Sequence, residues 1–579
     1  MEFRRTLIMV ALATVTYFMF LTWQQDYGNK PAVANEPAVT QEQETSALPV
    51  ATAETENNAE LPVAAPTAMA EVAALAPLVE NQSSTNELIL VTTDVFEVSI
   101  DPVGGDIVRV ALKQYTRAVG DNTPFVLMDR SQQLNYVAQS GLVKAVVPGL
   151  NNVLSGVDDH SQGRPVYKAA SNSFNLNDDQ ESVDVVLSTQ TPEGIQVNKT
   201  YRFHRGQYQI DVIQTVQNNS ASTWTGVPFG QIKRDSSKDP SADNHSFGMI
   251  TFLGGAWWTA DKNYNKLSLS DFAKKSERVT VDGGWAAMVQ HYFVSAWIPD
   301  ANSRNTIATR SNESTGENFI GFTGSPIVVE AGKSASLNAQ FYVGPKLQDR
   351  LKALSPGLEL TVDYGWLWPI AQFLFWVLKT LHGFIGNWGW SIIALTVLVK
   401  AAFFHLSATS YRSMANMRRV MPEMQKMKEK FGDDRAKLSQ AMMELYKKEK
   451  INPLGGCLPI LVQMPVFIAL YWTLMESVEL RHASWILWIQ DLSLMDPYFI
   501  LPLLMGVSMY LQQMLNPTPI DPMQAKVMKF MPVVFTVFFL WFPAGLVLYW
   551  LVNNVLSIAQ QWVITRQIEK ATAKATVAK

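Results

Sequence analysis

The chain has 579 residues, of which 47% are hydrophobic and 17% are charged, and its 47 basic and 51 acidic residues give a formal net charge of −4. This length allows several domains, while the single cysteine, Cys457, excludes an internal disulfide and zinc sites built from several thiolates. No HExxH, P-loop or GxSxG motif occurs, so we expect neither enzymatic activity nor a metal or other cofactor.

An apolar N-terminal run is the first predicted element. Residues 6–21 follow two arginines and are almost entirely apolar. Residues 32–34 resemble a signal-peptide cleavage site, but they lie more than ten residues beyond the apolar run, which favours an uncleaved transmembrane anchor over residues 1–23. Its basic flank predicts a cytoplasmic N-terminus. Residues 24–86 are rich in Ala, Pro, Glu and Thr, and we predict a flexible acidic periplasmic tether there.

Period-two alternation of apolar and polar side chains begins near residue 87. Residues 96–100 and 208–213 show this alternation, and turn signals such as Asp-Pro and Gly-Gly separate such runs. The pattern is typical of short antiparallel strands, so we predict an all-β sandwich over residues 87–345. Three tryptophans of this region either line a ligand cleft or belong to the core, and the sequence leaves both interpretations open: Trp257, Trp258 and Trp285.

Two apolar runs follow the β region, and the charge of the next segment decides their topology. If residues 366–385 and 388–406 both crossed the membrane, residues 412–450 would face the periplasm. That segment has eleven Lys or Arg against six acids, a net charge of +5 that is typical of the cytoplasmic side. We therefore predict that residues 346–387 form a linker and an amphipathic helix along the periplasmic membrane interface.

Five predicted spans form a membrane core over residues 388–566. Their lengths are near the roughly twenty residues that a helix needs to cross the hydrocarbon, and the charges between them alternate between outside and inside. With the anchor, this gives six transmembrane helices, a cytoplasmic hairpin over residues 407–453, a basic cytoplasmic tail over residues 567–579 and both termini in the cytoplasm. The predicted spans are residues 388–406, 454–475, 498–515, 527–541 and 544–564.

Lys400 lies inside the first core span, about 5 Å to the cytoplasmic side of its midpoint. A cation at such a depth costs at least about 2.5–3.5 kcal/mol unless water or a partner reaches it. One interpretation is that the lysine side chain snorkels to the headgroups. The other is that polar residues of neighbouring spans form a hydrated groove around it. A third possibility for these polar residues is that they only join the helices by hydrogen bonds. The predicted substrate groove comprises Lys400, Thr396, Gln463, Tyr549, Asn553, Ser557 and Gln560.

No acidic residue lies inside any predicted core span. A proton-coupled transporter would usually carry an intramembrane carboxylate, so this absence argues against that class of protein. A cation without a fixed counter-ion is instead suited to attracting a passing anionic group.

We predict that the cytoplasmic hairpin consists of two helices, with Gly432 capping the end of the first and Asp433 or Asp434 capping the start of the second. Methionines recur along the first helix at spacings of 3 and 4. This stripe either binds varied apolar client segments or packs the hairpin against itself, and the basic residues suit anionic lipid or ribosomal RNA. The predicted client or ribosome contacts are Met414, Met417, Arg418, Arg419, Met421, Met424 and Met427.

Several long motifs resemble those of the YidC insertase family. They are NPLGGCLP at residues 452–459, QMP at residues 463–465, FMP at residues 530–532 and FFLWFPAGL at residues 538–546. Lys400 falls where the family usually has arginine, which keeps the charge but removes the bidentate guanidinium fork. Trp550 falls where many Gram-negative relatives have a second tyrosine, so no hydroxyl role is carried over to it.

The resemblance implies a multi-domain protein with an α-helical polytopic membrane core of six transmembrane helices and an all-β periplasmic supersandwich. It implies an ATP-independent insertase of the bacterial inner membrane, acting alone or with the Sec translocon through a groove open to the cytoplasm and lipid. The implied partners are nascent inner-membrane proteins, the Sec translocon, the ribosome, the signal recognition particle receptor and anionic phospholipids. The alternative is a small-solute transporter or channel, although no inverted repeats are apparent.

Overall fold

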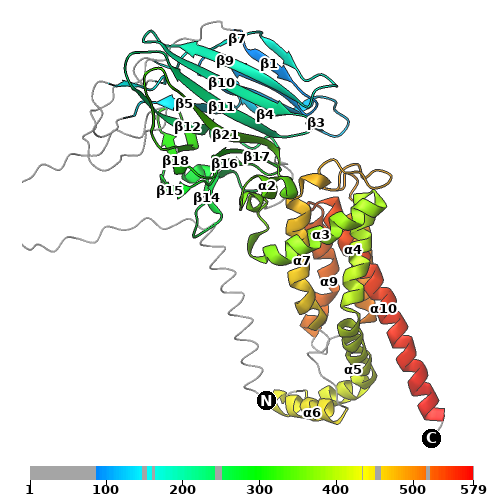
Figure 1. Cartoon of the computed structure of the whole chain (residues 1–579). Coiled ribbons are helices and arrows are strands. Elements are labelled where there is room, and N and C mark those ends of the chain that lie inside the picture. The colour runs from blue at the N-terminus through cyan, green and yellow to red at the C-terminus, as the bar shows by residue number, and fades with distance from the viewer. Residues whose placement is uncertain are drawn as a thin grey trace, which may run out of the picture. The chain divides into compact units, whose positions relative to one another are not determined.

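The computed structural model describes residues 87–145, 153–158, 163–241, 251–432, 434–449, 458–516 and 522–577. All of them belong to one compact unit, Thr55–Lys579, with strands in its N-terminal part and helices in its C-terminal part (Figure 1). The predicted anchor, the predicted tether and Cys457 lie outside the described residues.

A twelve-stranded sheet forms one layer of the β region. Its main path runs β15-β18-β19-β12-β5-β4-β3-β2-β1-β8, with β6 and β20 also paired to β12. The β1–β8 and β12–β6 pairs are parallel and the others are antiparallel. Its strands are β1 (Ile89–Thr92), β2 (Phe96–Asp101), β3 (Asp106–Thr116), β4 (Pro124–Arg130), β5 (Asn135–Val143), β6 (Leu154–Ser155), β8 (Ser173–Asn175), β12 (Trp224–Arg234), β15 (Arg278–Asp282), β18 (Arg304–Asn312), β19 (Glu317–Thr323) and β20 (Ile327–Val329).

A nine-stranded antiparallel sheet forms the second layer, in the order β14-β13-β16-β17-β21-β11-β10-β9-β7. Strand β10 alternates between buried and half-buried side chains along its whole length, as period-two patterning requires. Its strands are β7 (Lys168–Ala169), β9 (Ser182–Gln190), β10 (Ile195–His204), β11 (Gln209–Asn218), β13 (Gly254–Trp257), β14 (Asn265–Ser268), β16 (Ala286–Val289), β17 (Phe293–Pro299) and β21 (Ser334–Pro345).

The two sheets share one hydrophobic core, so the prediction of an all-β domain is confirmed. Trp257 and Trp285 are part of this core, and the half-buried Trp258 packs against it. The structure therefore supports the interpretation that the three tryptophans are core and rim residues. Patterning identifies apolar residues that face inward, but it does not distinguish a filled interior from an open one.

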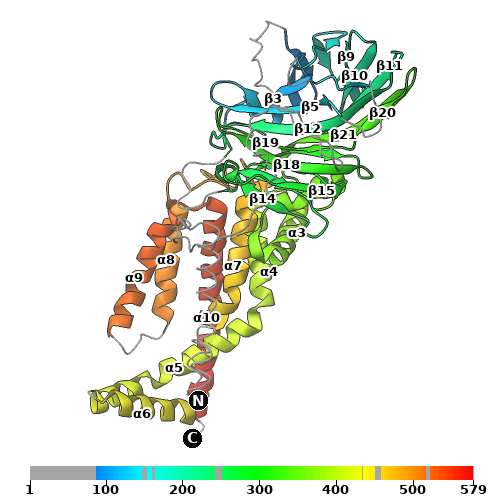
Figure 2. The same ribbon diagram turned by 90° about the vertical axis from the view of Figure 1, so that its left-hand side faces the viewer.

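The C-terminal part is helical, and its elements stand beside one another in Figure 2. Their buried faces form a second core that includes Leu395, Leu474, Met505 and Leu546. The helices are α2 (Gln348–Leu354), α3 (Trp368–Ile385), α4 (Trp388–Ala402), α5 (Phe404–Phe431), α6 (Arg435–Lys448), α7 (Leu458–Glu476), α8 (Ile500–Leu515), α9 (Pro522–Phe539) and α10 (Ala544–Val577), with 3-10 turns at Leu269–Asp271, Leu358–Thr361, Gly365–Leu367 and Val478–Leu480.

The junctions between helices follow local capping rules. Gly386 ends α3 with a left-handed φ of 73°, a conformation that glycine adopts without strain. Asn387 then caps α4 by accepting a hydrogen bond from the Trp390 N–H at 3.2 Å. Asp434 caps α6 as predicted, accepting from the Lys437 N–H at 3.0 Å. Gly432 follows α5 as predicted, but it stays in the right-handed helical region at φ −50°.

By length and composition, no single described helix passes as a membrane span, whereas α4 and α5 taken together do, bent by 67° at their junction. The predicted span over residues 388–406 falls on this bent pair, because α4 ends at Ala402 and the chain changes direction at Phe403. A continuous apolar run does not record such a change of direction. The other helices depart from the predicted bounds mainly at α9, which begins at Pro522, and α10, which continues to Val577.

A buried ion pair joins the segment after β21 to the end of α7. Lys346 Nζ lies 2.8 Å from Glu476 Oε2, and the two side chains are only 2% and 8% exposed. Nearby, the His291 ring nitrogen Nε2 lies 2.9 Å from the Met475 carbonyl oxygen. A buried pair of this kind is costly to break from one side, because the remaining charge would be left without a partner.

Candidate functional site

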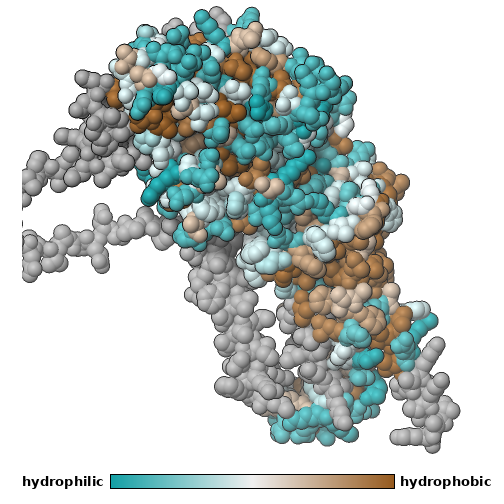
Figure 3. All heavy atoms as spheres, viewed as in Figure 1, coloured by the Kyte–Doolittle hydropathy of each residue, from teal (hydrophilic) through white to brown (hydrophobic). Residues whose placement is uncertain are grey.

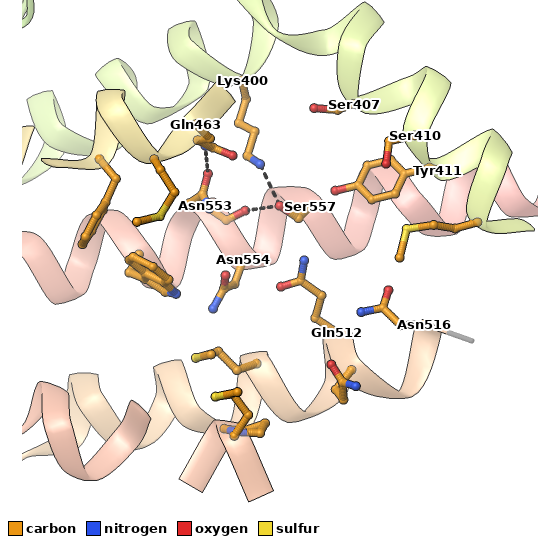
Figure 4. Close-up of a pocket in the computed structure, with 18 of the residues that line it drawn as sticks. Lys400, Ser407, Ser410, Tyr411, Gln463, Gln512, Asn516, Asn553, Asn554 and Ser557 are labelled. Carbon is orange, nitrogen blue, oxygen red and sulfur yellow. Dashed lines mark hydrogen bonds between the residues drawn. The ribbon is translucent and has the colours of Figure 1, made fainter. Parts of the chain in front are cut away.

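A cavity of about 290 Å³ lies among the helices, with walls from α4, α5, α7, α8, α9 and α10 (Figure 4). Its volume is enough for several water molecules, and it has both polar and apolar walls. The polar lining residues are Lys400, Ser407, Ser410, Tyr411, Gln463, Gln512, Gln513, Asn516, Tyr549, Asn553, Asn554 and Ser557.

Lys400 stands in the last turn of α4 and points toward α10. Its Nζ donates to Ser557 Oγ at 2.7 Å. The Ser557 hydroxyl in turn donates to the Asn553 main-chain oxygen at 2.7 Å, so it has lone pairs free to accept from the ammonium group. Gln463 Nε2 donates to Asn553 Oδ1 at 2.7 Å. Three predicted groove residues are thus joined to Lys400 in one polar network.

The ammonium group of Lys400 has no acidic partner among the residues that the structure describes, since no carboxylate oxygen there lies within 4 Å of it. A hydroxyl satisfies one of its three donors without neutralising its charge. The remaining donors face a cavity with room for water or for an acidic group of another chain.

The other predicted groove residues differ in whether they line the cavity. Tyr549 lines the cavity and is almost completely buried. Thr396 does not line it: its buried hydroxyl donates to the Ile392 carbonyl of the same helix at 2.7 Å. Gln560 also lies outside the lining, and its side chain donates to the Phe404 carbonyl at 3.3 Å, where it joins α10 to the start of α5. Helical spacing predicts that both residues lie near Lys400, but it does not show that their side chains are hydrogen-bonded to main-chain carbonyls.

Sequence reasoning missed the amide groups at the end of α8. Gln512 and Asn516 point into the cavity from the side opposite Lys400 (Figure 4). Asn554 donates to Ser508 Oγ at 3.1 Å, and Gln561 donates to Asn516 Oδ1 at 3.2 Å, so α10 is hydrogen-bonded to α8 along two turns. The signal was present, because adjacent glutamines interrupt an otherwise apolar run at residues 512 and 513.

Apolar side chains complete the cavity. Trp550 packs edge-on against Phe467 with ring centroids 4.4 Å apart, an arrangement that aromatic pairs favour. Met464, Met509 and Met531 lie on the same lining. An indole thus occupies the position for which the resemblance implies a tyrosine, and it serves here as packing.

The methionine stripe of α5 has three different environments. Met424 is buried with Val420 and Leu445, and Met417 and Met427 pack against the same cluster, so these residues hold α5 to α6. Met414 lines the cavity, while Met421 is half-buried and belongs to neither group.

The two predicted arginine contacts of the hairpin also differ. Arg419 is paired with Glu449 at 2.8 Å, and Arg418 is exposed. The ion pair of Arg419 and the packing of Met417, Met424 and Met427 between α5 and α6 both support the interpretation that the hairpin packs against itself.

Large apolar side chains are exposed on the outer faces of the helices. On α8 and α9 they include Leu503, Val507, Phe530, Val533 and Val534, each more than half exposed. On the face seen in Figure 3, hydrophobic residues gather over the helices and hydrophilic ones over the α5–α6 hairpin. Apolar patches of this extent are typical of surfaces that contact lipid or another protein.

Comparison with known proteins gives consistent matches along the chain. A family model described as the YidC periplasmic domain matches residues 88–377, and one described as 60Kd inner membrane protein matches residues 380–571. The chain is 53% identical to a membrane protein insertase YidC of Pseudomonas putida (strain W619), over 99% of this chain and 100% of the relative.

A second relative, the membrane protein insertase YidC of Stutzerimonas stutzeri (strain A1501), is 52% identical over 98% of this chain and 99% of its own length. Among solved structures, an active YidC insertase crystal structure matches with a TM-score of 0.36 and 16% identity, covering 82% of this chain and 92% of that one.

Proposed function

Because the chain belongs to the YidC family of membrane protein insertases, we propose that the cavity beside Lys400 is where the hydrophilic flank of a client protein enters the membrane. The chain is an insertase with a periplasmic β domain, and not an enzyme. Its task is to lower the cost of moving polar groups through hydrocarbon, which is several kcal/mol for each unsatisfied polar group.

One observation carries the proposal: a lysine lies inside a polar cavity with a hydroxyl as its partner and no carboxylate within 4 Å among the described residues. A structural lysine at such a site would be expected to have a counter-charge. Lys400 instead keeps an unneutralised charge next to space that another chain can enter. An acidic flank would be attracted into this space, while the adjoining apolar segment partitions sideways into lipid.

The proposed topology has six transmembrane helices. One is the anchor over residues 1–23, and five belong to the core over residues 388–566, so that both termini and the basic tail at residues 567–579 are cytoplasmic. The exposed apolar faces of α8 and α9 support this proposal. Helix α3 would lie along the periplasmic interface, since Trp368, Phe373 and Trp376 are exposed on it.

The proposed partners follow from the same reasoning. Nascent inner-membrane proteins would reach the α5–α6 hairpin at the ribosome, with the signal recognition particle receptor assisting delivery. The Sec translocon would hand over clients that it translocates in part. Basic residues of the hairpin such as Arg418 would meet anionic phospholipids, whose surface attracts cationic side chains by about 1 kcal/mol each.

Site-specific photocrosslinking tests the proposal. A photoreactive side chain at position 512, which lines the cavity, should crosslink to a ribosome-bound client during insertion. The matched control is position 498 at the start of the α8 segment, which is exposed and lies on the proposed periplasmic side. Equal crosslinking at both positions, or crosslinking at 498 alone, would contradict a route through the cavity.

A further inference from the structure

The segment that joins α7 to α8, residues 477–499, contains every non-glycine residue with a left-handed backbone in the part of the chain that the structure describes. These residues are His482, Leu487 and Phe499, with φ angles of 59°, 53° and 56°. A left-handed backbone is unfavourable for leucine and phenylalanine, because the Cβ atom comes too close to the following carbonyl oxygen. Such conformations persist where the surrounding structure fixes them, often at functional sites. Their concentration in one segment indicates that its shape serves a role.

Hydrogen bonds hold this segment in one shape. The buried carboxylate of Asp496 accepts from the Trp488 indole N–H at 2.9 Å. The main-chain N–H of Trp485 donates to the Ile489 carbonyl at 3.0 Å and closes a tight turn. Residues 486–488 form the tip of this turn.

The tip exposes large apolar side chains. Leu487 is 79% exposed and the neighbouring Ile486 is 38% exposed, and residues 483–490 carry no charge. Turn positions with a positive φ are usually occupied by glycine or asparagine, neither of which exposes an apolar side chain. A partner that covers Leu487 would account for leucine at this position.

The surroundings of the tip favour lipid as that partner. Trp485 packs edge-on against Trp390 with ring centroids 5.7 Å apart, and the Asn387 side-chain amide donates to the Ser484 carbonyl at 3.1 Å. These contacts place the tip beside the start of α4. Tryptophan is enriched at the level of the lipid headgroups. An uncharged tip between tryptophans suits the boundary of headgroups and acyl chains better than a protein surface, which usually adds polar pairing at its rim.

Exposed apolar side chains continue on both sides of the tip. On α8, which begins directly after the segment, Leu503 and Val507 are exposed. Phe384 is exposed at the end of α3, close in sequence to Asn387, which is hydrogen-bonded to the segment. The tip thus adjoins the helices whose outer faces support contact with lipid.

We propose that residues 485–488 insert into the outer leaflet of the membrane, with the side chains of Ile486 and Leu487 among the acyl chains and the indoles of Trp485 and Trp488 at headgroup level. This inference rests on the proposed topology, in which the α7–α8 segment is periplasmic. The inserted tip fixes the depth of α7 and α8, both of which line the cavity beside Lys400.

The test uses the full-length protein with Cys457→Ser, reconstituted in nanodiscs of phosphatidylethanolamine and phosphatidylglycerol. A nitroxide on Ile486→Cys reports its depth through its accessibility to oxygen, which concentrates among acyl chains, and to a water-soluble nickel chelate. The nitroxide is measured in chains with Leu487, Leu487→Met and Leu487→Asn. Methionine keeps an apolar side chain, whereas asparagine tolerates the left-handed backbone and removes the apolar group. Nitroxides on Lys274→Cys, at an exposed position of the β domain, and on Val507→Cys are the references for water and lipid.

With leucine or methionine at position 487, the ratio of oxygen to nickel accessibility at position 486 should exceed the ratio at position 274 several-fold. With asparagine at position 487, most of this excess should be lost. A ratio at 486 equal to that at 274 in the chain with leucine, or an unchanged ratio with asparagine, overturns the proposal. Low accessibility to both reagents also overturns it, because the tip is then covered by protein, and a short nitroxide–nitroxide distance would identify that protein as a second copy of the chain.

The reference at position 507 separates this inference from the proposed function. If 507 is lipid-like and 486 is water-like, the inserted tip alone is refuted. If 507 is also water-like, the proposed function fails with it, because that function requires α8 to lie in the membrane.

Discussion

At Lys400 the identity of the hydrogen-bond partner determines how much charge the site presents. A carboxylate would neutralise the ammonium group, whereas the Ser557 hydroxyl only orients it. The hydroxyl is itself fixed by its bond to the Asn553 main-chain oxygen. The lysine is therefore held in place without loss of its field.

If the role of Lys400 is attraction, its charge matters more than its shape. Lys400→Arg should keep activity, because guanidinium is also cationic. Lys400→Ala and Lys400→Glu should slow clients with acidic translocated flanks at least about ten-fold, corresponding to about 1.4 kcal/mol, and should slow clients with neutral flanks less. The measurement is insertion into vesicles of client pairs that differ only in flank charge. An equal loss for acidic, neutral and basic flanks would show that Lys400 hydrates the cavity instead.

Glu479 offers a residue-scale test of stability. Burial raises the pKa of this carboxyl, which follows α7 in a 3-10 turn, from 4.5 to about 7. A raised folded-state pKa means that the stabilising contribution is complete below pH 4.5 and is lost as the pH rises through 7. Glu479→Gln should therefore have a higher Tm than the wild type at pH 8 and a similar Tm at pH 4.5. Thermal unfolding of both proteins in detergent at pH 4.5 and pH 8 measures the two Tm values. An equal Tm difference between variant and wild type at both pH values would refute the prediction.

At the scale of elements, the hairpin combines two roles that its sequence does not separate. Met417, Met424 and Met427 close it internally, and Met414 reaches the cavity. The hairpin is thus anchored to itself while its N-terminal end forms part of the proposed client route.

Deleting residues 412–450 should impair capture of clients more than it lowers the amount of folded protein. The matched point variants are Met424→Ala, which should cost about 2–5 kcal/mol of local stability because its side chain is buried, and Met421→Ala, which should cost little. Crosslinking of nascent chains measures capture, and protein level in membranes measures stability. Normal capture of clients by the deletion variant would show that the hairpin is not part of the client route.

The strands and helices were largely predictable because their signals are local. Alternation in β10 and the Asn387 and Asp434 caps need only neighbouring residues. The site was predictable where one helix repeats polar residues, as at Asn553 and Ser557. Thr396 and Gln560 lie outside the cavity lining because their side chains bond to main-chain carbonyls, which no sequence pattern marks. The 67° bend between α4 and α5 was not predictable either, because the apolar run continues through it.

At the scale of the whole molecule, topology can be tested directly. Protease added outside spheroplasts should cleave within residues 87–345 and spare residues 412–450. A cysteine placed at position 430, in a variant with Cys457 replaced, should react only with membrane-permeant maleimide. If an impermeant reagent labelled this cysteine from the periplasm, the proposed orientation would be contradicted.

Division of labour between the two parts gives a further prediction. Removing most of residues 90–330 should leave insertion largely working, because Lys346 and its buried partner Glu476 both remain. The deletion does remove the His291 contact with the Met475 carbonyl, so a small loss of stability is expected. Insertion per folded molecule is the measurement. Complete loss of insertion by stably present protein would show that the β domain is required.

The serine beside Lys400 also bears on turnover. If insertion needs no ATP, as the resemblance to the family implies, the protein would have to release each client as readily as it admits the next one. A carboxylate partner would have to be displaced on every cycle, and a tightly bound acidic flank would have to be expelled. A hydrogen bond between an ammonium group and a hydroxyl is worth about 1.5–3 kcal/mol, less than the roughly 3–5 kcal/mol that breaking a buried ion pair costs. On the proposed route, we therefore expect the lysine to leave Ser557 for an incoming flank and to return once lipid has taken the apolar segment. On this proposal, the modest strength of the bond to Ser557 would let the site reset after each client.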